Sequence, residues 1–382
     1  MSVLFFLASM MFFVLALHPF IFYPLSLHLM KSRFLRPISQ GEPPKSYAIC
    51  VCAYNEASVI REKAQNLMAL KKALPGLEVF IYVDCASDDT AKILEEYRDE
   101  FDVTVATERH GKTYGMNLLV SKATADVVIF SDANVMLDIG SVSNLERYFS
   151  DPEVGCVCGH LKYVNGASSE TAENGSLYWK LEEWVKQMES DTGSIMGADG
   201  SIFAIRRELH VPPPVDMIDD MYVSFQILLA GKRIVRAPDV IAYEESVTIA
   251  REEFKRKVRI ACQAFNIHRA LWPRLKELPA FDLYKYVSHK LLRWFTIVWL
   301  AGGVASFELM LIAADLSGLA FGLLILGVIT LVAGFMIRIP VLSQIVDILY
   351  AFLGVGVGVW KSYSGERFQT WAPAASIRNK KV

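Results

Sequence analysis

Two long segments without charged side chains, one towards each end, constrain the fold of this 382-residue chain more than any other feature. Residues 2–30 contain no Lys, Arg, Asp or Glu, and about 20 apolar residues form a helix long enough to cross a bilayer. No basic residue precedes this run and no small-residue cleavage site follows it, so a retained anchor fits better than a cleaved signal peptide. Pro19 and Pro24 should bend the helix without ending it. The sequence therefore predicts an N-terminal transmembrane helix over residues 1–30.

The C-terminal region, residues 291–360, contains further apolar runs. Residues 294–314 carry a single charge and residues 316–337 carry none, so two crossings are predicted. Residues 339–360 are long enough for a third crossing, but it would place the basic tail, residues 361–382, on the far side of the membrane. A re-entrant or interfacial segment is therefore the expectation for this last run. Its three closely spaced glycines are interpreted as points of helix contact, because no Lys-Ser/Thr pair follows as in a phosphate loop.

The distribution of positive charge indicates which side of the membrane the central region occupies. Basic residues follow the first apolar run at 31–36 and precede the next at 274–293. Positive charge marks the cytoplasmic side, where thiols stay reduced. The central region, which holds all six Cys, is expected there with neither disulfides nor thiolate metal sites. Four of these Cys alternate along predicted strands and are expected to be buried: Cys50, Cys52, Cys156 and Cys158.

Short β-branched runs alternate with helical patterns between Tyr47 and Leu161, which implies a parallel sheet. The strand candidates are Ala48–Cys52, Val79–Asp84, Val103–Ala106, Val127–Ser131 and Val154–Gly159. Ligands bind such sheets beyond the carboxyl ends of the strands. Polar residues follow three of the candidates: Asn55 and Glu56, then Asp84, then Asp132. We therefore predict an α/β fold with a site at this edge.

Six motifs in a fixed order carry a family resemblance. They are AYNE (53–56), VDCASDD (83–89), GKTYGMN (111–117), FSDAN (130–134), MGADGSIFAIRREL (196–209) and IDDMYVSFQILLAGKRI (218–234). The ordered set resembles the family 2 inverting glycosyltransferases, and is most similar to the membrane-embedded branch of hyaluronan, chitin, cellulose and poly-N-acetylglucosamine synthases. The resemblance implies a GT-A domain with a mostly parallel sheet, placed at residues 45–248 and flanked by the membrane helices. It also implies a nucleotide-sugar donor, with a UDP-sugar as the first choice.

The resemblance assigns Asp132 to a divalent cation, Mg²⁺ or Mn²⁺, that bridges the donor diphosphate. Asn134 takes the place of the second acid of this motif. Its carbonyl oxygen can ligate a hard cation without contributing charge, so that the diphosphate supplies more of the coordination. The alternative is a helix N-cap before residues 138–140, since Asp and Asn both favour that position. For Asn134 the two interpretations stay open.

The donor pocket is assigned from the same motifs. Asp84 matches the family acid that holds the base or ribose, and Asn55 and Glu56 would close that pocket from the first strand. Cys85 stands where relatives often carry Asp, which leaves the base undetermined. Lys112 enters a predicted helix, and it either contacts the diphosphate or is solvated.

Asp220 is the predicted general base, with Asp219 beside it. An inverting displacement needs one carboxylate to deprotonate the acceptor hydroxyl while a metal stabilises the departing charge. Adjacent carboxylates raise one another's pKa, which suits a base. A helix start explains the same two acids and is compatible with catalysis. Asp199 resembles the loop beneath the acceptor, although a structural turn explains its flanking glycines almost as well.

Synthases of this branch carry a QxxRW motif at the membrane surface, and residues 256–260 occupy the equivalent place. Only the Arg survives, so Arg259 is assigned to the diphosphate. Ile260 replaces the Trp that stacks on the acceptor sugar, which weakens the case for a processive synthase. Residues 251–271 predict a basic amphipathic helix within an interfacial region, residues 249–290. Its apolar face consists of Phe254, Val258, Ala261 and Phe265.

The leading hypothesis is inverting transfer of a hexosyl or N-acetylhexosaminyl group onto a glycan or polyprenyl-linked acceptor in cell-surface polysaccharide biosynthesis. The bilayer is the expected partner, in the inner membrane of a bacterium, with the catalytic domain in the cytoplasm. A processive synthase that secretes its polymer and a catalytically impaired nucleotide-binding scaffold are the alternatives. No basic, aromatic-laced groove pattern occurs in the soluble part, which argues against nucleic acid.

Overall fold

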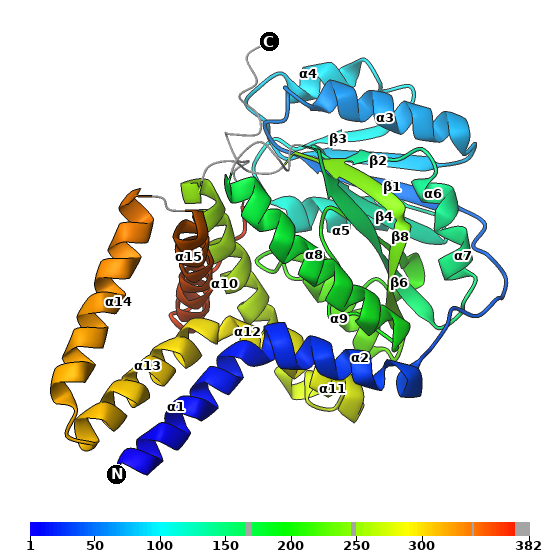
Figure 1. Ribbon diagram of the computed structural model, residues 1–382. Coiled ribbons are helices and arrows are strands. Elements are labelled where there is room, and N and C mark those ends of the chain that lie inside the picture. Colours follow the sequence, from blue (N-terminus) through cyan, green and yellow to red (C-terminus); the bar gives the residue numbers. More distant parts are fainter. Residues whose placement is uncertain (165–169, 246–249, 338–339, 371–382) are drawn as a thin grey trace. The chain divides into compact units, whose positions relative to one another are not determined.

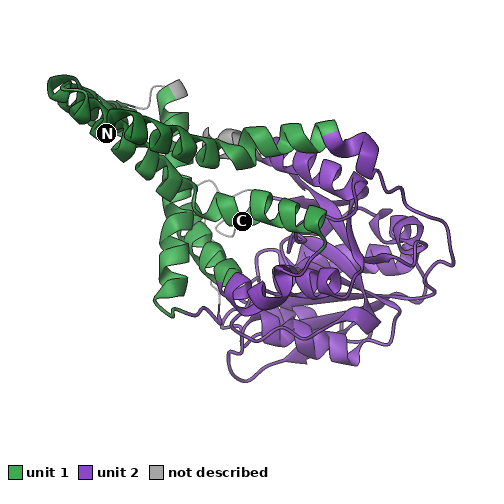
Figure 2. Ribbon diagram, turned by 90° about the horizontal axis from the view of Figure 1, so that it is seen from below, with its two compact units in different colours: residues 1–29, 253–265, 279–366 green, residues 30–252, 266–278, 367–382 purple. Residues whose placement is uncertain are grey.

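A computed structural model describes residues 1–164, 170–245, 250–337 and 340–370 of the protein. The chain divides into two compact units (Figure 2). Unit 1 comprises residues 1–29, 253–265 and 279–366, and unit 2 comprises residues 30–252, 266–278 and 367–382. Nearly all of the expected catalytic region therefore falls in unit 2. The end of the expected basic tail, residues 371–382, lies outside the described residues.

Unit 2 is built on a single sheet, which has eight strands in the described residues, in the order β3-β2-β1-β4-β7-β6-β8-β5 (Figure 1). The strands are β1 Tyr47–Ala53, β2 Glu78–Val83, β3 Asp102–Val105, β4 Val127–Asp132, β5 Met136–Leu137, β6 Val154–Tyr163, β7 Ile202–Arg206 and β8 Arg233–Glu244. The neighbours from β3 to β4 are parallel, as are β6 and β8. Strands β7 and β5 run antiparallel to their neighbours. The predicted α/β fold with a mostly parallel sheet and its five strands are confirmed.

Helices cover both faces of the parallel part of this sheet. Every residue of β1 is buried, as expected of a strand in a parallel sheet with both faces covered. The helices α3 Ile60–Ala73 and α4 Thr90–Glu95 lie on one face, and α5 Lys112–Lys122 lies on the other (Figure 1). The remaining helical segments of unit 2 are α6 Ser141–Asn144, α7 Glu146–Phe149, α8 Glu170–Asp191, a 3-10 turn Arg207–Leu209 and α9 Asp219–Leu229.

Strands β5, β7 and β8 were not among the predicted strands. In β8 the sequence pattern is broken by Pro238, which cannot donate a ladder hydrogen bond. The structure accommodates it where the register against β6 shifts, between Arg236 and Ile241, which is how irregular residues are tolerated within a sheet. The two strand pairs of Cys are buried, as predicted, and the six Cys are free thiols in this structure.

Unit 1 is helical. Its elements are α1 Ser2–Leu17, a π-helical turn His18–Phe22, α2 Tyr23–Phe34, α11 Ala280–Tyr286, a second π-helical turn Val287–Leu291, α12 Leu292–Trp294, α13 Thr296–Ala313, α14 Ser317–Ile337 and α15 Pro340–Tyr363, with α2 and α10 Ala250–Leu275 running on into unit 2. Within the described residues, four helical segments are long and apolar enough to cross a membrane by length and composition: 2–34, 296–313, 317–337 and 342–363. The expected bend at Pro19 is present as the π-helical turn. Whether residues 342–363 cross or lie at the interface stays a prediction.

Helices α1 and α13 pack through small residues. The Ser9 hydroxyl donates to the carbonyl oxygen of Gly303 at 2.9 Å. A Cβ atom on Gly302 or Gly303 would lie only 3.1–3.2 Å from the rings of Phe12 and Phe13. Small residues that let backbones approach closely are typical of helix contacts in membranes.

The amphipathic helix α10 has the predicted apolar face, and within unit 1 this face contacts α15. The ring of Phe254 stacks on Tyr350 at 4.3 Å between centroids. A Cβ atom on Gly358 would lie 2.6 Å from the Cβ of Ala261. The glycines of α15 therefore serve close helix contact, as predicted.

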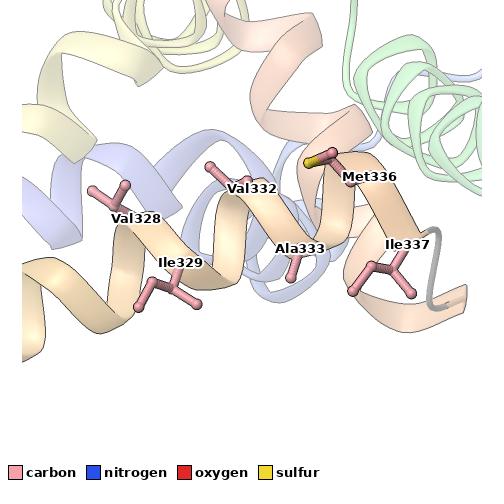
Figure 3. Close-up of a pocket in the computed structure, with 6 residues that line it drawn as sticks. All are labelled: Val328, Ile329, Val332, Ala333, Met336 and Ile337. Atoms are coloured by element: carbon pink, nitrogen blue, oxygen red, sulfur yellow. The ribbon is translucent and has the colours of Figure 1, made fainter.

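Helix α14 exposes an apolar surface with a shallow hollow (Figure 3). The side chains that line it are Val328, Ile329, Val332, Ala333, Met336 and Ile337. Met336 is 75% exposed, which suits a helix face in contact with lipid. Among the described residues, only apolar side chains line the hollow.

Candidate functional site

A half-buried lysine lies among carboxylates from distant parts of the chain. Lys112 is the first residue of α5, and its Nζ lies 2.8 Å from Oδ1 of Asp132, the last residue of β4. The same Nζ lies 3.5 Å from Oδ2 of Asp219, the first residue of α9. Asp220 follows directly, and a Cβ atom on Gly200 would lie 2.6 Å from its Oδ2 and 3.7 Å from Lys112 Nζ. The four side chains form one cluster in unit 2.

Local structure explains how the chain brings these groups to one place. Both Asp132 and the start of α5 lie at the carboxyl edge of the parallel strands. Asp219 and Asp220 occupy the first turn of α9, where the helix dipole favours negative charge. The dipole disfavours Lys112 at the start of α5, so the three carboxylates supply the compensating charge.

The electrostatics of the cluster make Lys112 a permanent cation and Asp220 a group that titrates near neutrality. Burial lowers the pKa of Lys112, but Asp132, Asp219 and Asp220 together raise that pKa well above its usual value. Burial and the neighbouring Asp219 raise the pKa of Asp220 to about 7, against the opposing effect of Lys112. A carboxyl group with this pKa is partly ionised at neutral pH and can accept a proton.

Asp132 and Asn134 present the oxygen atoms that a cation would need. The Asp132 side chain is 33% exposed. Asn134 donates from Nδ2 to Glu244 Oε1 at 2.9 Å, and its carbonyl oxygen has no partner among the described residues. The alternative interpretation as a helix N-cap is wrong, because the segment continues into β5 and the next helix begins only at Ser141.

The donor set fits a cation that is only partly held by protein. The described residues contain no group of three His, Cys, Asp or Glu arranged to hold a metal ion. Mg²⁺ is usually bound through one or two carboxylates together with substrate phosphates. Asp132, with the carbonyl oxygen of Asn134, matches that partial ligand set.

Asp84 is placed differently from the expectation of a carboxylate open to a ligand. Its side chain is fully buried. Its Oδ1 accepts from the backbone N–H of His110 at 2.8 Å, and its Oδ2 accepts from that of Gly111 at 3.1 Å. Arg109 Nε lies 3.5 Å from the same Oδ2. Asp84 therefore holds the loop that leads into Lys112, and direct contact with a base or ribose stays a prediction.

Asn55 and Glu56 lie beside this loop on the segment after β1. Asn55 adopts a left-handed backbone conformation (φ 53°) and its Oδ1 accepts from the N–H of Ser87 at 2.8 Å. Glu56 is buried, with 3% of its surface exposed. The Arg109 guanidinium lies 3.4 Å from the ring centroid of Tyr54. These residues lie beyond the carboxyl ends of β1 and β2, whereas the lysine–carboxylate cluster lies at the carboxyl end of β4.

Asp199 lies on the loop next to Asp220 and is held by a buried cation. Its Oδ2 forms an ion pair with Lys186 of α8, and its backbone N–H donates to Cys158 Sγ at 3.3 Å. Lys186 also lies 3.3 Å from Glu183, which Arg236 contacts at 2.7 Å. The Oδ1 atom of Asp199 has no partner among the described residues. The expected close backbone approach is present at Gly200, where Asp220 leaves no room for a Cβ atom.

Arg259 belongs to unit 1. It lies on α10, and its Nη1 donates to Gln263 Oε1 at 3.2 Å. Its assignment to the diphosphate stays a prediction.

Sequence reasoning missed Lys186 and Lys63, two lysines buried in unit 2. For Lys63 a signal was available in the helical spacing. It lies three residues after Ile60 and four before Leu67, on the buried face of α3. A lysine at such a position has either a partner or a function.

Comparison with known proteins relates unit 2 to enzymes that transfer sugars. The family model described as Glycosyl transferase family 2 matches residues 48–211. The poly-β-1,6-N-acetyl-D-glucosamine synthase of Staphylococcus epidermidis is 23% identical over 255 residues, which are 64% of this chain and 61% of that protein. The β-monoglucosyldiacylglycerol synthase of Trichormus variabilis is 26% identical over 194 residues, 48% of this chain and 41% of that protein. The chain thus spans less than two thirds of the length of these relatives.

A solved structure supports the fold. The mannosyltransferase PcManGT from Pyrobaculum calidifontis, in complex with GDP-Man and Mn²⁺, superposes with a TM-score of 0.71 at 21% identity. The match covers 94% of this chain and 99% of that one. The two chains therefore share a fold.

Proposed function

Since residues 48–211 match the model of glycosyl transferase family 2 and the chain shares the fold of a solved mannosyltransferase, we propose that this protein transfers a sugar from a nucleoside-diphosphate donor to an acceptor hydroxyl, with inversion. The observation that carries the proposal is the convergence of Asp132, Asp219 and Asp220 on Lys112. Asp220 there can accept a proton, and Lys112 together with a cation at Asp132 can hold a diphosphate. Inverting transfer needs both.

Asp220 is the proposed base. It takes the proton from the acceptor hydroxyl, and the hydroxyl oxygen attacks the anomeric carbon on the face opposite the diphosphate. The bond from that carbon to the diphosphate oxygen breaks, and the electron pair leaves with the diphosphate. An α-linked donor therefore yields a β-linked product.

Lys112 is the proposed partner of the leaving diphosphate. Its ammonium group faces the carboxylates at 2.8 and 3.5 Å, and a bound diphosphate would offer it a second set of anionic oxygens. Asp132, with Asn134, would hold a divalent cation, Mg²⁺ or Mn²⁺, which neutralises charge on the departing diphosphate when bound. PcManGT, with its GDP-Man and Mn²⁺, supports the same kind of donor and metal for this chain.

Donor and acceptor follow from the relatives. One relative is named as a poly-N-acetylglucosamine synthase and another as a glucosyldiacylglycerol synthase. We infer a nucleotide-sugar donor, with UDP-sugars tested first and GDP-mannose next, and a glycan or lipid-linked acceptor. Asp199 is proposed to contact the acceptor through its Oδ1, which has no partner in the described part of the chain, while Asn55, Glu56 and Asp84 shape the donor pocket.

A membrane location accompanies the proposal. The four apolar helices support an integral membrane protein. The basic residues at 31–36 and 274–293 support a cytoplasmic catalytic domain. In a bacterium, the proposed membrane is therefore the inner membrane.

The decisive experiment is turnover of a panel of nucleotide sugars by the purified full chain, with Mn²⁺ or Mg²⁺ and with metal removed by chelation. We expect one donor to be consumed in a metal-dependent manner. The variant Asp220→Asn should lose at least about 1,000-fold in turnover, because an amide cannot take the proton from the acceptor hydroxyl. Asp102→Asn is the matched control. Asp102 is an exposed carboxylate on β3, at the edge of the sheet, and it pairs with Lys122. Turnover that persists in Asp220→Asn would exclude Asp220 as the base.

This chain has Asn134 where the family motif has its second acid. That difference favours a second candidate function, a nucleotide-binding scaffold without catalytic activity. It predicts nucleotide binding without turnover across the whole panel. The length of the product separates single addition from processive synthesis, because a processive enzyme makes a ladder of lengths from labelled donor.

A further inference from the structure

Lys63 is a fully buried lysine beneath the loop that presents Asp132. It projects from α3, and none of its surface is exposed. Its Nζ donates to Ser131 Oγ at 2.9 Å and to the carbonyl oxygen of Val135 at 2.6 Å. These acceptors flank Asp132 and Asn134 in the sequence. The ammonium group therefore lies on the inner side of the loop whose outer side carries the cluster.

Lys63 has no acid partner. Both of its acceptors are uncharged, and no carboxylate in the described part of the chain forms an ion pair with it. Burial of a cation without a paired anion is costly. Burial lowers the pKa of Lys63 to about 7, and the nearby charge of Asp132 offsets only part of that effect, so the charged ammonium form is one of two forms present at neutral pH. A methionine would fill the same space at lower cost, so packing alone does not explain the lysine.

Holding the loop in place does not require a charge either. Asn66, one turn further along α3, already fixes the end of the loop with neutral groups. Its Nδ2 donates to the carbonyl oxygen of Leu137 at 2.8 Å, and its Oδ1 accepts from the N–H of Leu137 at 2.9 Å. The pairing of β5 with β8 holds the same residues from the other side.

We propose that Lys63 is a positioning residue whose buried positive charge strengthens the binding of the diphosphate at the Asp132 loop and of the charge that develops as it leaves. The inference rests on the proposed function. Lys63 does not touch the donor. It acts through the loop and through the electrostatic field inside a region of low dielectric, where an unscreened charge has a large effect.

The test compares two neutral variants of Lys63 in the full chain. Lys63→Met removes charge and hydrogen bonds, whereas Lys63→Gln removes the charge and keeps a donor. Binding of UDP and GDP is measured by calorimetry with Mn²⁺ present, alongside UMP and GMP, which lack the second phosphate. We expect both variants to lose about 10- to 100-fold in affinity for the diphosphates and to bind the monophosphates nearly as the wild type does.

Thermal unfolding in the absence of nucleotide separates this role from a structural one. If Lys63 only stabilised the fold, Lys63→Met would lower the unfolding temperature. Lys63→Met should unfold no earlier than the wild type, because removing an unpaired buried charge offsets the lost hydrogen bonds. Lys71→Met is the matched control on the same helix, where the ammonium group meets Glu100 at the surface at 3.2 Å. It should leave binding unchanged. All comparisons are made at a temperature at which the circular dichroism of each variant matches the wild type.

The outcomes separate this inference from the proposed function. A wild type that binds neither diphosphate refutes the proposed function. A wild type that binds, together with Lys63→Gln of equal diphosphate affinity, overturns the role of the charge, whatever Lys63→Met does. An equal loss for monophosphate and diphosphate also overturns it, because the effect is then not specific to the second phosphate.

Discussion

At the scale of single residues, Asp220 and its neighbours determine how the proposed chemistry depends on pH. Burial, Asp219 and the loop carboxylate Asp199 raise the pKa of Asp220, and Lys112 lowers it. The balance leaves a base that loses its proton near neutral pH. Each of these three charged groups should therefore shift the pH dependence of the rate.

The pH–rate profile should show an acid limb near pH 7. The proposed base works only when ionised, so kcat/KM should fall as pH drops through the Asp220 pKa of about 7. In Asp219→Asn the adjacent negative charge is gone, and the limb should move to lower pH. It should not reach the range of an exposed carboxyl group, because burial remains. A limb that stays in place in Asp219→Asn would contradict this electrostatic account.

Removal of Lys112 should destabilise the protein most at neutral pH. Lys112→Met leaves three carboxylates close together without their cation, a change that costs about 3–5 kcal/mol when fully buried. The lysine side chain is 22% exposed, so we expect about 1–3 kcal/mol.

The protonation of the carboxylates determines how the loss of stability in Lys112→Met changes with pH. The raised pKa of Lys112 keeps it charged throughout the neutral range, so its contribution is complete there. As pH falls and the carboxyl groups take up protons, the repulsion in the variant disappears and the difference in unfolding temperature from the wild type should shrink. A difference that grows on acidification would show that Lys112 stabilises the fold in another way.

At the scale of elements, the site depends on how closely three segments approach. The loop between α8 and β7 passes Asp220 at Gly200, and α5 and α9 meet at Lys112 and Asp219. Lys186 of α8 anchors that loop through Asp199. The lengths and packing of these elements therefore set the geometry of the reacting groups.

The close approach at Gly200 gives a test. In Gly200→Ala the new Cβ would lie 2.6 Å from Asp220 Oδ2, so the carboxylate or the loop must move. A displacement of about 1 Å at a reacting group can cost about 100-fold in rate. We expect a loss of that order in kcat/KM with little change in unfolding temperature.

Gly140→Ala is the control for this substitution. A Cβ atom there would meet its nearest neighbours at 3.6 and 3.8 Å, which is ordinary contact. It should retain full activity. Equal rates for Gly200→Ala and the wild type would show that the loop does not constrain Asp220.

At the scale of the whole molecule, the last described residues bear on the number of membrane crossings. Gln369 Nε2 donates to the carbonyl oxygen of His110 at 3.1 Å, and Arg367 lies 3.4 Å from Asp216. Residues 367–370 thus pack within unit 2, which the chain leaves after residue 278. A segment that leaves and returns to the same side crosses a membrane an even number of times.

We therefore predict that α13 and α14 cross and that α15 does not. A tag appended to the C-terminus should lie on the same side as unit 2, and a tag at the N-terminus should lie on the opposite side. Protease protection of each tag in sealed inverted membrane vesicles, compared with an engineered site in unit 2, measures this. A C-terminal tag on the side opposite to unit 2 would mean that α15 crosses.

Much of the fold could be predicted because it depends on local patterns. The five strands with β-branched runs, the buried Cys pairs and the apolar face of α10 all follow from periodicity within a few residues. The apolar helices follow from length and the absence of charge. Strand β8 could not be found in this way, because Pro238 hides it and a shift in register against β6 accommodates it.

The sequence by itself determined which residue types were available: acids after the strands, two more at the start of a helix, and uncharged helices long enough to cross a membrane. Only the tertiary structure decided their partners. It paired Lys112 with the carboxylates, closed both oxygens of Asp84 with backbone N–H groups, and placed Lys63 under Asp132 with uncharged hydrogen-bond acceptors. The physical reason is one of range. Periodicity records whether a side chain faces the core, whereas pKa, strain and ligand geometry depend on contacts between residues tens to hundreds of positions apart.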